Sequence, residues 1–172
     1  MRLLKVLCFL FCAQVSYTQT LGSNDALSES VYYFIRHAEK DRSNPENKNP
    51  ELNQQGKIRA LNWLYFFRDI PLKKIYSTNY NRTIQTVKQI AEEKKISISY
   101  YSPENIDVES FKKQNKNMSI LVVGHSNTTP ELVNLIIGEN KFEKMNDNDN
   151  SSLFVIRELA GDVTVERMIT KD

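Results

Sequence analysis

The sequence predicts one α/β domain with three layers, α/β/α, and a mainly parallel sheet that has an antiparallel edge near the C-terminus. Three observations support this class. Strand-like apolar runs alternate with amphipathic helical patterns between residues 31 and 138, which is typical of a parallel sheet covered on both faces. Two strand-like runs near the C-terminus flank Gly161-Asp162 and predict a hairpin. The chain of 172 residues has room for a single ordinary domain.

The individual elements follow from hydrophobic periodicity and from turn residues. Residues 31–35 (VYYFI) form a β-branched and aromatic run, as expected of a strand buried on both faces. Further strands are expected at 74–77, 96–101, 119–123, 153–157 and 163–168. Helices are expected from an N-cap at Asn53 to about residue 69, and at 81–95, 108–116 and 130–138. A polar loop is expected at 146–150.

Two details of the helices can be predicted. The helix after Asn53 is expected to carry Ile58, Leu61, Leu64 and Tyr65 on one face, because these recur at helical spacing. The last helix is expected to begin at Pro130 and to end at a Gly138 C-cap.

The first 18 residues predict a secretory signal peptide. A short basic start (Arg2, Lys5) precedes an apolar run at 6–13 that is too short to span a bilayer as a helix. Cleavage there leaves one domain at 19–172 and predicts a secreted or periplasmic protein. It also removes Cys8 and Cys12, so the remaining chain has no disulfide. An uncleaved anchor and lipidation at Cys12 are the alternatives.

Charge excludes two classes of partner. The formal net charge is +2, and it falls to zero once the basic residues of the signal are removed. This balance is too small for a nucleic-acid-binding protein or for a protein that binds membrane surfaces. A phosphorylated substrate would therefore be attracted by local basic groups.

Basic and imidazole side chains occur at the expected carboxyl ends of three strands, where parallel α/β sheets place their ligand crevice. These are Arg36-His37 after the first strand, Arg82 after the second, and His125 after the run at 119–123. Arginine offers a fixed fork of donors to phosphoryl oxygens, and neutral imidazole can accept a phosphoryl group. The combination predicts phosphoryl transfer without a metal or another cofactor.

These residues belong to four motifs in a fixed order. The motifs are Arg36-His37-Ala38-Glu39-Lys40, Leu52 to Ala60 (LNQQGKIRA), Ile75-Tyr76-Ser77-Thr78 with Arg82, Thr83 and Thr86, and Val122 to Asn127 (VVGHSN). Their order and spacing resemble those of the histidine phosphatase superfamily, also called phosphoglycerate mutase-like, over nearly the whole mature chain. In length, and in lacking a segment large enough to cover the site, the chain resembles the small members, which include phosphohistidine phosphatases.

The resemblance implies a role for each motif residue. His37 would attack phosphorus and carry a covalent phosphohistidine that water hydrolyses. The phosphoryl oxygens would be held by Arg36, Arg82 and a protonated or donating His125. Ser77 and Asn127 would add donors for the substrate.

The proton donor is implied less directly. Many members carry a Glu some two dozen residues after the second arginine, and here Glu104, Asp107 and Glu109 lie in that stretch. Glu104 is predicted to be the donor because it follows a strand. Other members place Asp directly after the second histidine, but this chain has Ser126 there.

The sequence therefore predicts a phosphoric monoester hydrolase acting on a small phosphorylated molecule or a phosphoprotein. A phosphate-binding or interaction protein of the same fold, with little or no turnover, is the alternative. Metal-dependent hydrolysis through both histidines with Glu39 and Glu131 is disfavoured because no ligand-spaced pair occurs. A mutase is disfavoured because it needs an enclosed site.

Overall fold

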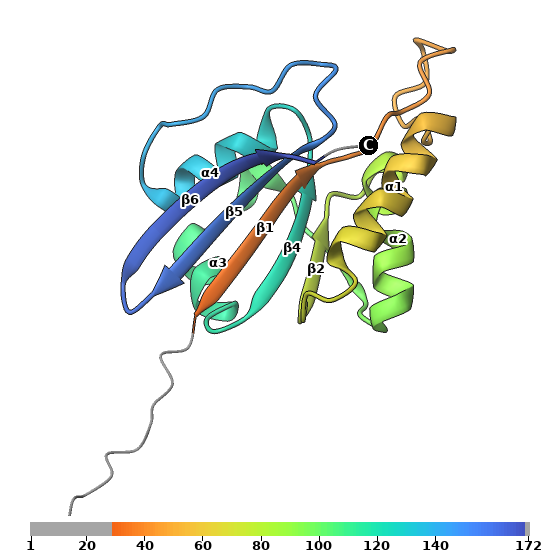
Figure 1. Ribbon diagram of the computed structural model, residues 1–172. Coiled ribbons are helices and arrows are strands. Elements are labelled where there is room, and N and C mark those ends of the chain that lie inside the picture. The colour runs from red at the N-terminus through yellow and green to blue at the C-terminus, as the bar shows by residue number, and fades with distance from the viewer. Residues whose placement is uncertain (1–28, 171–172) are drawn as a thin grey trace, which may run out of the picture.

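The computed structural model describes residues 29–170, so the predicted signal peptide lies outside the described residues. One six-stranded sheet has the order β3-β2-β4-β1-β5-β6 (Figure 1). The strands are β1 (Ser30–Arg36), β2 (Lys74–Ser77), β3 (Ile98–Tyr100), β4 (Ser119–Gly124), β5 (Ser152–Leu159) and β6 (Asp162–Ile169). β1 to β4 are parallel to one another, and β5 and β6 continue the sheet antiparallel. The predicted fold class is confirmed.

The helices cover both faces of the sheet. They are α1 (Gln54–Phe67), α2 (Asn81–Lys94), α3 (Val108–Gln114) and α4 (Thr128–Ile137), with a short 3₁₀ turn η1 (Pro103–Asn105). Alternate residues of β1 point to opposite sides: Tyr33 packs with α1 and α2, and Tyr32 packs with α3 and α4. β1 is buried along its whole length for this reason, as its continuous apolar sequence predicted. None of the helices in residues 29–170 is long and apolar enough to cross a membrane.

Several boundaries differ from the sequence prediction by one or two residues, and two of these differences have a clear physical reason. α4 begins at Thr128 rather than at Pro130, so the proline lies in the first turn of the helix. Backbone N–H groups in a first turn have no partner within the helix, so the missing N–H of proline costs no hydrogen bond there. The C-terminal hairpin turns at Ala160-Gly161 rather than at Gly161-Asp162, with φ values of 53° and 95°. Two successive positive φ values are the geometry of a two-residue turn whose twist matches that of the flanking strands.

The apolar face that the sequence predicted for α1 is not the face that the helix buries, although Leu64 packs at the edge of the core. The buried residues are Gly56, Arg59, Ala60, Trp63 and Phe67, while three of the predicted residues are exposed, namely Ile58, Leu61 and Tyr65. The helix is rotated because Trp63 and Phe67 bury more apolar surface than the aliphatic side chains would. The close approach of Gly56 to another segment requires the same rotation.

Replacing Gly56 with alanine is expected to lower the free energy of unfolding by about 1–3 kcal/mol or more. A β-carbon there would overlap the backbone carbonyl oxygen of Glu39, and two backbone segments cannot separate easily. Chemical denaturation of the variant measures the loss. Gln55→Ala, at the neighbouring exposed position of the same helix, is the control and should leave stability nearly unchanged. Equal stability of both variants would contradict the close contact between Gly56 and the backbone of Glu39.

Candidate active site

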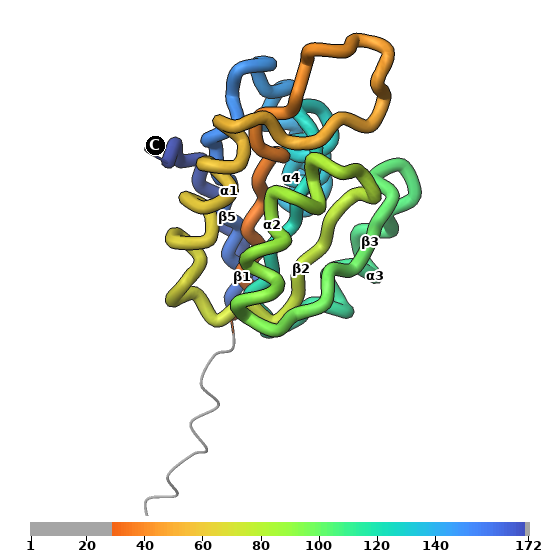
Figure 2. The backbone as a smooth tube through the Cα atoms, turned by 90° about the vertical axis from the view of Figure 1, so that its right-hand side faces the viewer, coloured from red at the N-terminus to blue at the C-terminus, as the bar shows by residue number. Residues whose placement is uncertain are grey.

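A cavity of about 420 Å³ lies at the carboxyl ends of β1, β2 and β4. Six residues predicted from the sequence line it together: Arg36, His37, Arg82, Glu104, His125 and Asn127. Figure 2 shows the loop after β1 and the loop before β5 side by side at this end of the molecule. Residues far apart in the sequence therefore meet here because parallel strands end at one edge of the sheet.

His37 presents one unprotonated ring nitrogen. Its Nδ1 lies 2.7 Å from the carbonyl oxygen of Ala38, so Nδ1 carries the proton and donates it. Nε2 consequently carries the lone pair. Burial, partly offset by this hydrogen bond and reinforced by Arg36 and Arg82, lowers the pKa of His37 to about 3. The ring is therefore neutral, as a nucleophile must be.

Arg36 is held by backbone carbonyls on one side only. Its Nη1 donates to the carbonyl oxygens of Asn146 (2.8 Å), Asp147 (3.0 Å) and Asp149 (3.2 Å). Its Nε is buried and has no hydrogen-bond partner among the described residues. The carboxylate of Asp147 is 3.7 Å from Nη2, with its side chain mostly exposed. Burial lowers the pKa of Arg36, an energetic cost that a bound anion would offset.

Arg82 is in the first turn of α2, where it contacts an aromatic ring and an imidazole. Its guanidinium carbon lies 4.4 Å from the centre of the Tyr80 ring, and Nη2 lies 3.4 Å from Nδ1 of His125. Nε and Nη1 are buried without hydrogen-bond partners among the described residues. Buried donors are rarely left unpaired in native proteins. Arg36 and Arg82 line the same cavity and each has an unpartnered donor, which suits a phosphoryl group.

His125 is fixed as a neutral ring by its neighbours. Nδ1 accepts from Arg82, so Nε2 carries the proton and donates to Oγ1 of Thr78 at 3.0 Å. Thr78 in turn donates to Thr83 at 3.1 Å. Burial and the charges of Arg82, Arg36 and Lys40 lower the pKa of His125 to about 4. A bound phosphate dianion would add the opposite charge beside the ring and favour its protonated form.

The two predicted substrate-binding residues are placed differently. Asn127 is exposed at the N-cap position of α4, and its side chain does not cap the helix. Ser77 is fully buried, and its hydroxyl donates to the carbonyl oxygen of Thr78 at 2.9 Å. Ser77 does not line the cavity.

The loop of residues 146–150, which the sequence predicted only as a polar connection, forms part of the site. Besides the carbonyls that accept from Arg36, Asn150 donates from Nδ2 to the carbonyl oxygen of His37 at 2.8 Å. Asp149 holds the loop to β6 through Arg167, with a distance of 2.6 Å. The density of Asn and Asp was the available signal, since these residues form tight side-chain turns.

The second motif supports the segment that follows His37. Glu39 accepts from Nε of Arg59 at 2.8 Å and 3.0 Å. The backbone N–H of Asn53 donates to the carbonyl oxygen of Glu39, and the side chain of Asn53 caps α1 by accepting from Gly56. This motif therefore positions the loop that follows His37.

The lowered pKa values predict acid sensitivity of the unliganded protein. Both histidines have an ordinary pKa of about 6.5 when unfolded, against about 3 for His37 and 4 for His125 when folded. Below pH 6.5 the unfolded chain therefore binds more protons, and the free energy of unfolding should fall as pH drops from 6.5 toward 4. Urea unfolding across this range measures the slope. His37→Gln should make it shallower, and an unchanged slope would contradict the buried neutral ring.

Acidic and imidazole groups do not form an evident metal site in the part of the chain that the structure describes. No group of three or more His, Cys, Asp or Glu side chains in residues 29–170 is arranged to hold a metal ion. Glu39 contacts Arg59, and Glu131 lies on the exposed side of α4.

Comparisons with known proteins relate this chain to one superfamily. Residues 32–102 match the family model of the histidine phosphatase superfamily, branch 1. No curated protein matches the sequence.

Several solved structures share the fold. The protein histidine phosphatase SixA, solved with tungstate, is 13% identical, with a TM-score of 0.62 over 81% of this chain and 96% of that chain. An Agrobacterium tumefaciens protein assigned as the phosphohistidine phosphatase SixA is 22% identical, with a TM-score of 0.56 over 78% and 97%. Phosphoglycerate mutase from Bacillus anthracis is 16% identical, with a TM-score of 0.59 over 82% and 93%. The sequence match over residues 32–102 and the shared fold together confirm the resemblance to the histidine phosphatase superfamily.

Proposed function

We propose that this protein is a phosphatase that hydrolyses phosphomonoesters or phosphoramidates through a covalent phosphohistidine on His37. One observation carries the proposal: His37, whose Nε2 is unprotonated, lines a cavity that two guanidiniums with unpartnered donors also line. A binding protein would need the arginines, but it would not need a buried neutral histidine held in the nucleophilic tautomer.

The reaction has two steps. In the first, the lone pair of Nε2 attacks phosphorus, and the bond from phosphorus to the leaving oxygen or nitrogen breaks. Arg36 and Arg82 neutralise the charge on the three peripheral oxygens, and His125 donates to them once it is protonated. In the second, water attacks the phosphohistidine, inorganic phosphate leaves, and His37 returns to its neutral form.

Hydrolysis is favoured over a mutase reaction by the rim of the cavity. Exposed side chains of Arg42, Glu104, Asn127 and Asp147 line it, so water can reach a phosphoryl group on His37. The structures named as phosphohistidine phosphatases share the fold, and one of them was solved with the tetrahedral anion tungstate. Phosphoglycerate mutase shares the fold as well, so the distinction rests on the rim.

The purified protein should hydrolyse para-nitrophenyl phosphate near neutral pH and should remain fully active in excess chelator. Retained activity supports the metal-independent mechanism. Activity that is lost with chelator and restored by a divalent cation would overturn it. A panel of sugar phosphates, nucleotides, inositol phosphates and phosphoproteins then narrows the substrate.

We assign Glu104 as the proton donor to the leaving group, since it is an exposed carboxyl on η1 that lines the cavity. Glu104→Gln should slow hydrolysis of an alkyl phosphate by about a hundredfold or more, because an alkoxide needs a proton to leave. Hydrolysis of para-nitrophenyl phosphate should change little, because nitrophenolate leaves unaided. Glu109→Gln, on the adjacent α3 and outside this cavity, is the matched control. Equal losses on both substrates would remove Glu104 from this role.

We also propose that the protein acts outside the cytoplasm, on the strength of the signal-like sequence at residues 1–18. N-terminal sequencing of the protein from a cell fraction should find Gln19 or a nearby residue as the first residue. An intact Met1 in a cytoplasmic fraction would contradict this.

A further inference from the structure

A second cavity, of about 700 Å³, lies between α4 and the loop of residues 139–147, and we call it the α4 groove. The apolar side chains that line it are Pro130, Leu135 and Phe142. Leu135 is 53% exposed, although it belongs to an otherwise well-packed helix. In Figure 1 the loop leaves the end of α4 and returns above it toward β5.

The side chain of Asn134 fixes the loop to α4 and so holds the shape of the α4 groove. Asn134 donates from Nδ2 to the carbonyl oxygen of Phe142 at 2.8 Å and accepts from the N–H of Phe142 at 2.9 Å. The ring of Phe142 also packs edge-on against Phe154, with ring centres 5.0 Å apart. The loop is therefore fixed to the helix, and a ligand would bind without first ordering it.

The groove and the active-site cavity meet at the N-terminal end of α4. Asn127 lines both of them. The loop passes from one to the other, since Lys144 lines the groove and Asp147 lines the active-site cavity. Between these two residues, the N–H of Met145 donates to the carbonyl oxygen of Ser126 at 2.8 Å, which joins the two walls.

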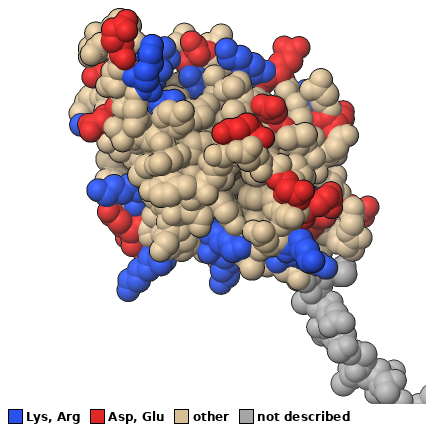
Figure 3. Space-filling model, turned by 180° about the vertical axis from the view of Figure 1, so that it is seen from behind, with Lys and Arg blue, Asp and Glu red and all other residues tan. Residues whose placement is uncertain are grey.

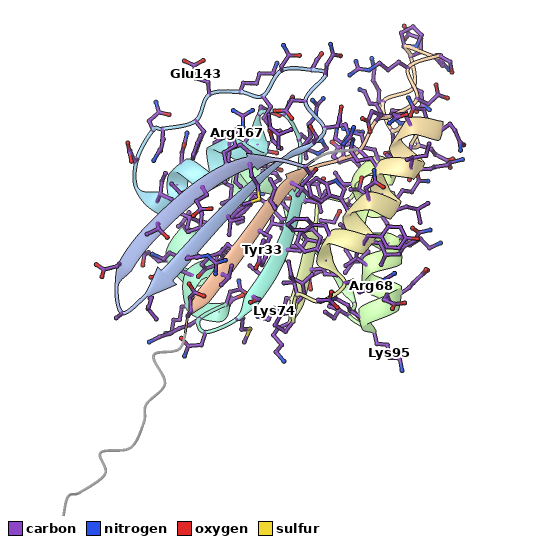
Figure 4. The ribbon with its side chains drawn as sticks, in the orientation of Figure 1. Tyr33, Arg68, Lys74, Lys95, Glu143 and Arg167 are labelled. Carbon is purple, nitrogen blue, oxygen red and sulfur yellow. The ribbon has the colours of Figure 1, made fainter. Side chains whose placement is uncertain are left out.

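The charges of the two cavities are opposite. The groove is lined by three carboxylates and one ammonium group, namely Glu131, Glu139, Glu143 and Lys144. The active-site cavity instead has four Lys or Arg side chains against two carboxylates. Acidic side chains are prominent on the α4 side of the molecule seen from behind (Figure 3), and Glu143 extends from the loop above α4 (Figure 4).

The dipole of α4 adds to this separation of charge. Its positive end points to the active-site cavity, and its negative end lies at Gly138 with no basic residue in the last turn. A ligand with a phosphoryl group at one end and a cation at the other therefore matches the pair of cavities. The helix between Asn127 and Gly138 spans about 16 Å, which is the length of roughly five residues of extended peptide.

We propose that the α4 groove binds the polypeptide that flanks the phosphorylated residue of a phosphoprotein substrate, a segment with an apolar side chain and a Lys or Arg. This rests on the proposed function and names its substrate class. A small phosphorylated molecule would fill the active-site cavity without reaching Leu135 or Glu139. The apolar side chain would contact Leu135 and Phe142, and the basic residue would lie near Glu139 and Glu143.

The test compares two fluorescent phosphohistidine peptides that carry leucine and either lysine or glutamate on both sides of the phosphohistidine. Binding is measured with the His37→Ala protein, which leaves the peptides intact, and turnover with the wild type. The lysine peptide should bind roughly tenfold or more tightly than the glutamate peptide. The double variant Glu139→Lys/Glu143→Lys should lose this preference, and Leu135→Asn should weaken binding of both peptides. Glu93→Lys, on the exposed surface of α2, is the charge control.

Hydrolysis of para-nitrophenyl phosphate should be unchanged in every groove variant, which separates this inference from the proposed function. If the wild-type protein binds the lysine peptide selectively but hydrolyses nothing, the proposed phosphatase function is refuted and peptide binding in the α4 groove is supported. If para-nitrophenyl phosphate is hydrolysed but the wild type and the double variant each bind both peptides equally, peptide binding in the α4 groove is refuted. A wild-type dimer that Leu135→Asn converts to a monomer would also overturn it, because a second copy would then cover the groove.

Discussion

His37→Ala is expected to abolish phosphatase activity, with kcat reduced by at least about a thousandfold. The imidazole is the group that forms the bond to phosphorus, so the remaining arginines can bind a substrate but cannot replace the acceptor. The measurement is steady-state hydrolysis of para-nitrophenyl phosphate, together with rapid quench of the wild type. The quench should trap a phosphoenzyme on His37 that is labile in acid and stable in alkali.

The variant should remain folded, which makes the result interpretable. His37 is buried and neutral, and its side chain donates a hydrogen bond to the carbonyl oxygen of Ala38. Asn150 contacts the backbone carbonyl of His37, which the substitution keeps. The free energy of unfolding should therefore change by only about 1 kcal/mol. Full turnover in folded His37→Ala would refute the phosphohistidine mechanism.

Arg82→Ala is expected to lower kcat/KM by about a hundredfold or more, a loss of ~3 kcal/mol of transition-state stabilisation. Two of its donor atoms are buried without partners in the described part of the chain, so their hydrogen bonds are available to a phosphoryl group. Removing this desolvated cation should not lower the stability of the unliganded protein, and phosphate should no longer raise the unfolding temperature as strongly.

Two variants make the Arg82 result specific. Arg68→Ala is the matched control, because Arg68 also lies over an aromatic ring, at 4.9 Å from the centre of Tyr65, but does not line the cavity. It follows the C-terminal end of α1 (Figure 4). Arg68→Ala should leave kcat/KM unchanged. Arg82→Lys should restore only part of the activity, since an ammonium group lacks the planar fork. A fully active Arg82→Ala would remove the residue from phosphate binding.

The second motif shows why a pattern can be recognised before its purpose is understood. Gly56 and Arg59 belong to a run that predicted a helix and matched a family pattern. Only the structure shows that Gly56 lies against the backbone of Glu39 and that Arg59 binds its carboxylate. These contacts join segments about twenty residues apart, and hydrophobic periodicity carries no information about them.

The sequence by itself determined the fold class, the order of the elements and the residues at the strand ends. Local signals suffice for these, because β1 is a continuous apolar run and parallel strands end at one edge of the sheet. The tertiary structure decided the rotation of α1, the partner of His37 Nδ1 and the loop that holds Arg36. The rotation of α1 depends on packing, and the tautomer of His37 depends on the backbone geometry at the adjacent Ala38. The contacts that hold Arg36 are hydrogen bonds to residues more than a hundred positions away, such as Asn146. The Arg36-His37 pair was visible in the sequence, but the tautomer of His37 and the unpartnered donor of Arg36 were not.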